Sequence, residues 1–406
     1  MMPKIFLLMP AWHKHRIGGA VVISTLVAVL AVFALACVGG CGNNTKRSES
    51  ETAVPSRTGL VVINPQFDLA FEFSEGLAPV RIGDYKTGKW GYIDKQGHYM
   101  VNPQFDTALR FREGLARVQI GDIWTGKWGF IDKQGHYVVN PQFDWTQDFS
   151  EGLASVRIGD VKTGKWGFID KQGHYVVNPQ FDWSQDFSQG LASVRVGDDK
   201  TGKWGCIDKE GHFVVNPQFD WAVKFSEGLA PVRIGDDKTG KWGYIDKQGH
   251  YVVNPQFGYA GQFSEGLARI RIGDDKTGKW GYIDKQGHYV VNPQFDGAGQ
   301  FSEGLAEVRI GDDKTGKWGF VDKQGKFVIN PQFGPPFLDF SDPDQFSDGL
   351  VAVRLGADDT AKWGYIDKQG HYVVNPQFDY AGQFSEGLAP VRIGDDKTGK
   401  YGYVAR

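Results

Sequence analysis

Residues 241–257, KWGYIDKQGHYVVNPQF, recur almost unchanged along most of the chain, and this repetition decides the fold. The Trp-Gly pair marks the period, which is 38 residues in all but one step. The successive pairs begin at Trp90, Trp128, Trp166, Trp204, Trp242, Trp280, Trp318, Trp363 and Tyr401, with a step of 45 residues before Trp363 and Tyr in place of Trp in the last pair. A fixed period of this length is typical of solenoids, propellers and linear arrays, so residues 59–406 are interpreted as one array.

One unit contains three short segments with strand character. Residues 229–235 alternate between small or aliphatic side chains and variable ones, which predicts a half-buried strand. Residues 241–246 predict a second strand, in which Gly243 lets another backbone or a ring approach closely. Residues 250–253 predict a third strand after a type I turn, and Pro217 is interpreted as the mark of a strand end. The expected fold class is therefore all-β, a continuous array of three-stranded antiparallel meanders.

Three motifs recur through residues 59–406: Lys-Trp-Gly-Tyr-Ile-Asp-Lys-x-Gly, Asn-Pro-Gln-Phe-Asp and Phe-Ser-Glu-Gly-Leu-Ala. Together they resemble the WG repeat of bacterial proteins, with nine tandem copies in this chain. The resemblance implies an often exported repeat protein whose repeats serve as interaction modules.

The array begins and ends inside a unit. Residues 59–65 match only the third strand, and residues 401–404 match only the second. Joined together, these pieces would complete one meander and close the array into a propeller-like ring. Nine units of three strands are unusual for a propeller, where four-stranded blades and up to eight blades are typical. We therefore expect an open solenoid or superhelix, with the closed ring as the alternative.

The N-terminal segment has the features of an export signal. Residues 1–40 begin with three Lys or Arg side chains and continue as an uncharged apolar run. The run ends in Val38-Gly39-Gly40-Cys41, which resembles the lipobox of bacterial lipoproteins. That resemblance implies a cleaved signal peptide and a lipid, such as palmitate, on Cys41, with residues 41–58 as a disordered polar tether. We expect a lipid-anchored protein at the outer membrane or cell surface, with an uncleaved transmembrane anchor as the alternative.

The array has no pattern typical of an active site. Nearly every polar residue recurs in seven to nine units, so we expect no catalytic residues, no cofactor and no metal site. The formal net charge of −3 gives no reason to expect nucleic acid as a partner. Seven histidines occupy one position of seven units and are interpreted as exposed polar side chains, with a metal-binding or pH-sensitive row as the alternative. Cys206 replaces an aromatic residue and is expected to be a small buried thiol.

Tryptophan at one variable position of the connector is the best candidate for a binding site. Trp145, Trp183 and Trp221 fill this position in three consecutive units, whereas another copy holds Gly297 there. The insertion at residues 334–346 is interpreted as a tolerated loop, with calcium binding by its aspartates as the alternative. We predict a non-enzymatic, membrane-tethered scaffold that binds an envelope protein, and alternatively a module that binds cell-wall carbohydrate.

Overall fold

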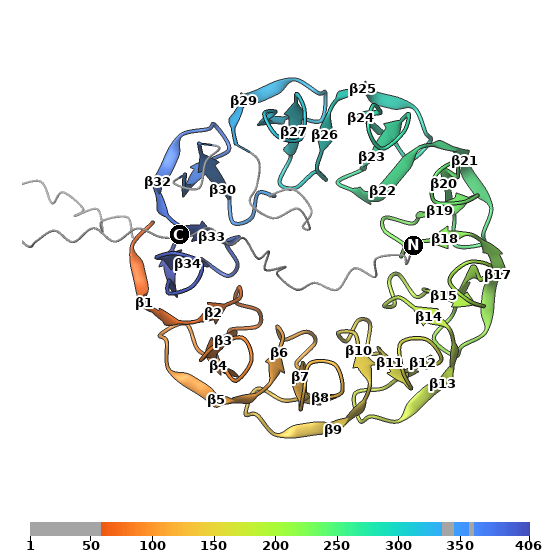
Figure 1. Ribbon diagram of the computed structural model, residues 1–406. Helices are drawn as coiled ribbons and strands as arrows, with labels where there is room; N and C mark the ends of the chain where they lie inside the picture. The colour runs from red at the N-terminus through yellow and green to blue at the C-terminus, as the bar shows by residue number, and fades with distance from the viewer. Residues whose placement is uncertain (1–57, 335–344, 357–360) are drawn as a thin grey trace, which may run out of the picture. The chain divides into compact units, whose positions relative to one another are not determined.

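The computed structural model describes residues 58–334, 345–356 and 361–406. These residues form 35 β-strands in nine antiparallel sheets, which are arranged as the blades of a ring (Figure 1). No helix among the described residues is long and apolar enough to cross a membrane. The predicted signal peptide, the lipidation of Cys41 and nearly all of the tether lie outside the described residues, as do the aspartates of the insertion.

Eight blades contain four strands, and blade 8 contains three among the residues described. Numbered in chain order, blade 1 begins at β2 and blade 9 begins at β33. The inner strands are β2 (Leu69–Ala70), β6 (Thr107–Ala108), β10 (Trp145–Thr146), β14 (Trp183–Ser184), β18 (Trp221–Ala222), β22 (Tyr259–Ser264), β26 (Gly297–Ala298) and β33 (Tyr380–Ala381). The second strands are β3 (Ala78–Ile82), β7 (Ala116–Ile120), β11 (Ala154–Ile158), β15 (Ala192–Val196), β19 (Ala230–Ile234), β23 (Leu267–Ile272), β27 (Ala306–Ile310), β30 (Leu350–Leu355) and β34 (Leu388–Ile393).

The third and outer strands complete each blade. The third strands carry the Trp-Gly pair and are β4 (Lys89–Ile93), β8 (Lys127–Ile131), β12 (Lys165–Ile169), β16 (Lys203–Ile207), β20 (Lys241–Ile245), β24 (Lys279–Ile283), β28 (Lys317–Val321), β31 (Lys362–Asp367) and β35 (Lys400–Ala405). The outer strands are β5 (Tyr99–Phe105), β9 (Tyr137–Phe143), β13 (Tyr175–Phe181), β17 (Phe213–Phe219), β21 (Tyr251–Phe257), β25 (Tyr289–Phe295), β29 (Phe327–Phe333), β32 (Tyr372–Phe378) and β1 (Val61–Phe67).

The prediction of three strands per unit was wrong, because the connector forms a short inner strand. In blade 5, Trp221 pairs with Arg233 and Ala222 pairs with Val232. The interpretation of the Asn-Pro pair was also wrong, since Pro217 lies inside the outer strand β17 and does not mark a strand end. The outer strand is the edge of its sheet, where a proline without an N–H is tolerated.

The close backbone approach predicted at Gly243 is confirmed. A Cβ atom on Gly243 would lie 2.4 Å from the carbonyl oxygen of Val253 in the outer strand. The outer strand bulges at this point, because Trp242 pairs with Phe257 whereas Tyr244 pairs with Val253. The glycine of the Trp-Gly pair therefore gives the bulged Asn-Pro segment room to lie against the third strand.

The blades form a closed ring, so the open solenoid that we preferred was wrong and the alternative is correct. Strand β1 pairs with β35 and becomes the outer strand of blade 9, with Ile63 opposite Tyr403 and Phe67 opposite Tyr401 (Figure 1). An open array would leave the aromatic side chains of two end units exposed to water. Because β1 from the start of the array pairs with β35 at its end, the aromatic side chains of both end units are buried.

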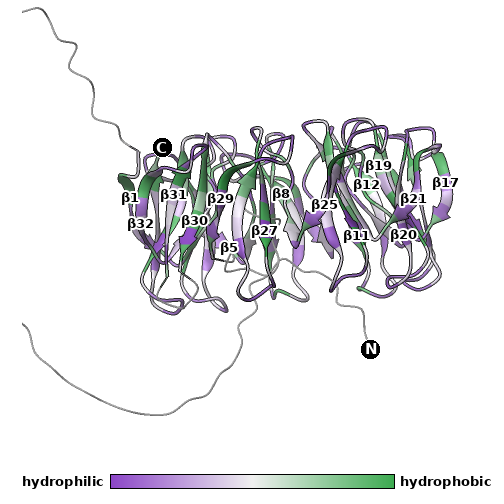
Figure 2. Ribbon diagram, turned by 90° about the horizontal axis from the view of Figure 1, so that it is seen from above, coloured by the Kyte–Doolittle hydropathy of each residue, from purple (hydrophilic) through white to green (hydrophobic). Residues whose placement is uncertain are grey.

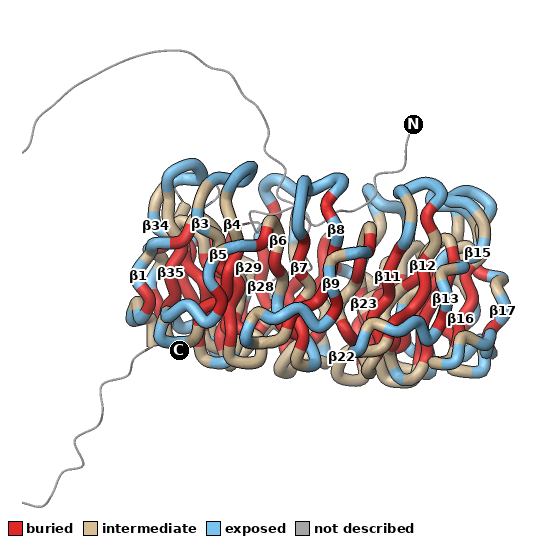
Figure 3. Tube along the Cα trace, turned by 90° about the horizontal axis from the view of Figure 1, so that it is seen from below, coloured by how far each residue is buried: buried red, intermediate tan, exposed pale blue. Residues whose placement is uncertain are grey.

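The hydrophobic core lies between blades and not within them. Each of nine clusters of buried side chains combines residues of two neighbouring blades. Between blades 5 and 6, Trp242, Tyr244 and Phe257 pack with Phe263 and Ile270. Figure 3 shows the buried segments in the middle of the strands, and the exposed ones in the loops and along the outer strands. Figure 2 shows apolar segments along the strands and hydrophilic loops. A single repeat therefore has no core of its own.

The turns gather on two faces of the ring, as the antiparallel strand order requires (Figure 2). In blade 5, the turns at residues 226–229 and 246–249 lie on one face, which we call the Glu face after its Ser-Glu-Gly turns. The loop at residues 235–240 and the crossover at residues 257–259 lie on the opposite face, which we call the loop face.

Candidate functional site

The three tryptophans predicted as a binding site begin the inner strands of three consecutive blades. Each indole packs against the Trp-Gly tryptophan of the preceding blade, with ring centroids 5.2–5.4 Å apart. The pairs are Trp145 with Trp128, Trp183 with Trp166, and Trp221 with Trp204. Trp221 is 38% exposed, and the other two are partly buried. These rings therefore join neighbouring blades, and their binding of a ligand stays a prediction.

The seven histidines lie beside exposed turns of the Glu face and do not converge. Each imidazole faces the aspartate four residues earlier, as when His250 Nδ1 lies 3.2 Å from Asp246 Oδ2. The His250 side chain is 78% exposed. Within the described part of the ring, no three His, Cys, Asp or Glu side chains lie close enough together to hold a metal ion.

The buried thiol expected at Cys206 is confirmed. Cys206 has no exposed surface in the third strand of blade 4, where other blades hold Tyr or Phe. Burial raises the pKa of the thiol to about 11, although a hydrogen bond with Ser193 opposes this rise. At neutral pH the group is therefore protonated and a poor nucleophile.

The recurrent glutamates of the Glu face connect all nine blades. In each Ser-Glu-Gly turn the side chain at the Glu position accepts a hydrogen bond at 2.8–3.1 Å from the glycine N–H of the next blade. The series closes on itself, because Glu386 of blade 9 binds the N–H of Gly76 in blade 1. All nine residues at this position have φ between 51° and 57°, a left-handed conformation that the interblade contact holds in place.

The recurrent aspartate that follows the outer strand makes the corresponding contact on the loop face. At seven interfaces its carboxylate accepts hydrogen bonds from a Lys Nζ of its own blade at 2.5–2.6 Å and from a glycine N–H of the next blade at 2.8–2.9 Å. These aspartates are Asp68, Asp106, Asp144, Asp182, Asp220, Asp296 and Asp379. Burial opposes the charge of Asp220, but Lys203 and the Gly235 N–H outweigh it and lower the pKa of this carboxyl.

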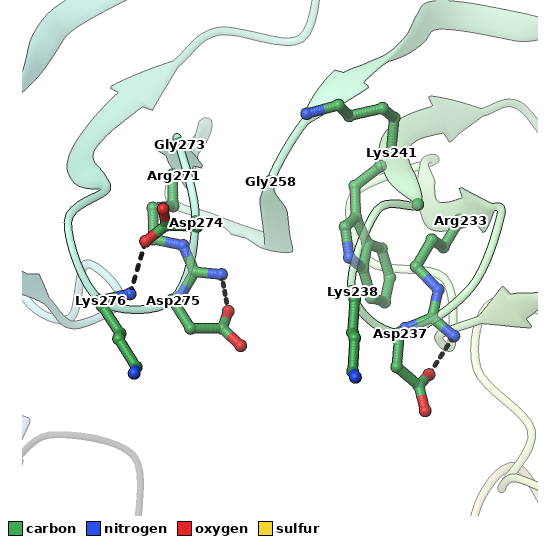
Figure 4. A pocket seen from close by; sticks show the side chains of 12 residues that line it. Arg233, Asp237, Lys238, Lys241, Gly258, Arg271, Gly273, Asp274, Asp275 and Lys276 are labelled. Atoms are coloured by element: carbon green, nitrogen blue, oxygen red, sulfur yellow. Dashed lines mark hydrogen bonds and ion pairs between the residues drawn. The ribbon is translucent and has the colours of Figure 1, made fainter.

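Gly258 and Gly334 stand where the other blades have this aspartate. Beside Gly258 the loop face is hollowed by a cleft of about 410 Å³ between blades 5 and 6. Figure 4 shows Gly258, in the crossover from β21 to β22, between two loops, with the Arg233–Asp237 ion pair on one side and the Arg271–Asp275 pair on the other. Arg233 Nη2 and Asp237 Oδ1 lie 2.6 Å apart. The cleft is the clearest departure from the repeat on this face.

A second departure is a partly buried polar cluster formed by Arg117 of the second strand β7 and by two aspartates that lie between the inner and second strands of the next two blades. The Arg117 guanidinium of blade 2 lies 2.7 Å from Asp148 of blade 3. Asp186 of blade 4 is largely buried, and its Oδ1 has no hydrogen-bond partner. Burial, together with the nearby charge of Asp148, raises the pKa of Asp186 to about 6, while Lys224 and Arg117 oppose this rise.

Both departures were visible in the sequence but were missed. Gly258 appears as Gln-Phe-Gly where seven other copies read Gln-Phe-Asp, and Asp148 and Asp186 stand where four copies have Gln. Neither substitution forms a known catalytic or metal pattern. A substitution inside a repeated contact indicates a candidate site only when the structure shows which groups that contact joins.

Comparison with solved structures finds matches of low identity and low TM-score, among them one β-propeller domain. TolB from Acinetobacter baumannii is 11% identical with a TM-score of 0.31, and the match covers 65% of this chain and 77% of TolB. The β-propeller domain of the Trilobed protease from Pyrococcus furiosus is 8% identical with a TM-score of 0.37, and the match covers 68% of this chain and 99% of that domain. The tricorn protease is 10% identical with a TM-score of 0.25, and the match covers 84% of this chain but only 39% of the protease.

None of the curated proteins matches this chain in sequence. The pattern of the WG containing repeat does match, and it does so nine times. The matched residues are 56–85, 90–124, 128–161, 166–200, 204–238, 242–276, 280–314, 318–334 and 363–401. These segments cover most of the nine-bladed ring, and the chain therefore belongs to the family of proteins built from the WG containing repeat.

Proposed function

We propose that this protein is a non-enzymatic scaffold, tethered to the outside of a bacterial membrane, that binds partner proteins of the envelope. One observation supports the binding role above the others. The outer strands expose their first two side chains, and in most blades these are an aromatic residue and a valine. Tyr251 and Val252, for example, are 42% and 43% exposed. We call this series of side chains around the ring the outer belt.

The outer belt has the properties of a surface for protein contacts. Contiguous exposed apolar side chains mark interaction sites in soluble proteins. The belt recurs from blade to blade, so weak contacts with a partner that engages several blades add up to strong binding. The proline inside each outer strand removes an N–H from the free edge of the sheet, which limits pairing with stray strands.

Capture of envelope proteins tests the scaffold role. The chain immobilised on resin should retain specific proteins from detergent-solubilised envelopes. Replacing Val138, Val176 and Val214 by lysine should abolish this capture without lowering the melting temperature, because these side chains lie at the surface. The matched control places three lysines at exposed turn glutamines, Gln96 and Gln134 among them. Equal capture by the belt variant and the control would refute the role of the belt.

The tether is supported by the sequence around Cys41. A labelled fatty acid fed to cells should be incorporated into the protein, and Cys41→Ser should abolish the incorporation and release the ring from the membrane fraction. A Cys37→Ser variant is the matched control, since Cys37 lies in the same apolar segment. Incorporation that survives Cys41→Ser would overturn this assignment.

Binding of cell-wall carbohydrate is the second candidate, because Trp221 keeps an exposed indole surface. Aromatic faces are common contact surfaces for sugars and peptides alike. Sedimentation with purified sacculi separates the two functions. A carbohydrate-binding protein would sediment with sacculi, and Trp221→Ala would reduce that fraction, whereas the outer-belt variant would sediment normally.

A further inference from the structure

The aspartate missing at Gly258 leaves two hydrogen-bond donors without a partner. At the seven interfaces that keep the aspartate, its carboxylate binds one Lys Nζ and one glycine N–H. The equivalent donors at the interface of blades 5 and 6 are Lys241 Nζ and the N–H of Gly273. Among residues 58–334, 345–356 and 361–406, neither donor has a hydrogen-bond or ion-pair partner.

The chain cannot supply the carboxylate itself with its present backbone. A Cβ atom on Gly258 would lie 2.1 Å from the carbonyl oxygen of Gly273, far inside van der Waals contact. A carboxylate that arrives from another molecule has no bond to residue 258 and avoids this collision. Gly334, the other position without the aspartate, lies directly before residues 335–344, which are outside the described part of the chain.

The cleft at this position carries an excess of positive charge. Five cationic side chains and three acidic ones line it. Asp237 and Asp275 are paired with arginines, and Asp274 accepts the N–H groups of Lys276 and of the next residue in its own loop at 2.8 Å. Figure 4 shows Lys241 extending toward the crossover at Gly258 while Lys238 and Lys276 point away from it. The free ammonium of Lys241 is thus the cation that an incoming anion meets beside Gly258.

We propose that the cleft between blades 5 and 6 binds a carboxylate of a partner protein, which takes the place that an aspartate side chain fills at seven other interfaces. The same two donors, a Lys Nζ and a glycine N–H, bind a carboxylate at seven other interfaces, which favours a carboxylate as the ligand here. The proposal rests on the scaffold function for the source of the carboxylate, but a defined peptide tests the site separately from the capture of envelope proteins.

The test titrates the full chain with the peptide N-acetyl-Gly-Asp-Gly-amide and follows the peptide by NMR. The Asn analogue of the peptide and acetate serve as comparison ligands. We expect the Asp peptide to bind, Lys241→Gln to weaken its binding at least tenfold, and Lys241→Arg to restore it, since a charge-assisted hydrogen bond is lost and regained. Lys203→Gln is the matched control, because Asp220 already occupies the equivalent position in that blade.

The outcomes distinguish the alternatives. Binding of the Asp peptide that depends on Lys241 but not on Lys203 supports the site. If acetate bound as tightly as the peptide, the proposal of a partner protein would be wrong, and the ligand would be a free small acid. No binding of the Asp peptide, equal binding of the Asn peptide, or unchanged affinity in Lys241→Gln would overturn the carboxylate site. The melting temperature of each variant shows whether the ring is intact.

Discussion

Closure of the ring by β1 leads to a prediction that distinguishes two kinds of outer strand. One is held in its blade only by non-covalent contacts, and the other is covalently connected to the third strand of its blade. The outer strand of blade 9 is joined to the other strands of that blade only by non-covalent contacts, whereas in every other blade the chain runs from the third strand through a turn into the outer strand. Replacing Ile63 and Phe67 of β1 by alanine should therefore open the ring as well as weaken its core. The matched control is the same pair of substitutions in β29, at Ile329 and Phe333, where the strand has the same residue types at the same positions.

The magnitude follows from burial. Ile63 and Phe67 are 3% and 1% exposed, and Ile329 and Phe333 are each 3% exposed. Substitutions of buried Ile and Phe by Ala cost about 2–5 and 3–5 kcal/mol, so each double variant should lose about 5–10 kcal/mol. Whole domains are stable by about 5–15 kcal/mol, so a strand held only by such contacts should detach.

Limited proteolysis and small-angle scattering measure the difference. We expect the β1 variant to be cut by chymotrypsin at Leu69 or Phe71, and to show a larger radius of gyration under native conditions. The β29 variant should lose comparable stability in urea but stay compact until it unfolds, because its strand remains tethered. If the two variants opened and were cut alike, our account of closure by a single exchanged strand would be wrong.

Three further predictions concern single residues. Cys206 should resist alkylation in the native protein and react fully in urea, as judged by mass spectrometry of its peptide, because burial raises the pKa of its thiol to about 11; rapid native alkylation would contradict this. Burial raises the pKa of Asp186 from 3.8 to about 6, so the folded state binds the proton more tightly than the unfolded state does; the contribution of Asp186 to stability should be fully present below about pH 4 and be lost as the pH rises through 6, by up to about 3 kcal/mol. Asp186→Asn should remove that part of the pH dependence in urea titrations, and an unchanged profile would contradict the assignment. Glu227→Ala should lower the free energy of unfolding by about 1–2 kcal/mol through loss of the contacts with the Gly266 N–H and with Lys285, whereas Glu227→Gln should lose less than about 1 kcal/mol, since it removes only the exposed ion pair with Lys285 and Gln189 makes the glycine contact in the native ring; equal losses in the two variants would show that the glycine contact is not the cause.

The sequence alone was sufficient to predict the period, the all-β class, the second and third strands, and the close approach at Gly243. It was not sufficient for the inner strand. Trp221-Ala222 is only two residues long and has no periodicity of its own, so it exists as a strand only because Arg233 and Val232 lie beside it. Closure was hard to predict for a similar reason. The curvature that brings β1 to β35 is the sum of nine interblade contacts, and no single repeat encodes it.

The side-chain contacts of the candidate site were hard to predict for the same reason, because they join neighbouring blades. The tryptophans were chosen because they vary between copies, but variation by itself does not distinguish a binding surface from packing between blades. Trp183 contacts Trp166 of the preceding blade, and such a contact cannot be read from one repeat. The departure at Gly258 became informative only when Lys203, Asp220 and the Gly235 N–H were seen together at an equivalent interface.

Repetition helps to separate structural polar residues from candidates for function. The Glu of the Ser-Glu-Gly turn and the Asp after the outer strand recur in most blades and contact the adjacent blade each time, so their role is to hold the ring together. A contact that all blades need is not free to bind anything else. Function in such a ring must therefore come from surfaces that repeat without an internal partner, such as the outer belt, or from interfaces where one member of a repeated contact is missing. Lys241 belongs to the second group, because its counterparts at seven interfaces are bound to an aspartate and it is not.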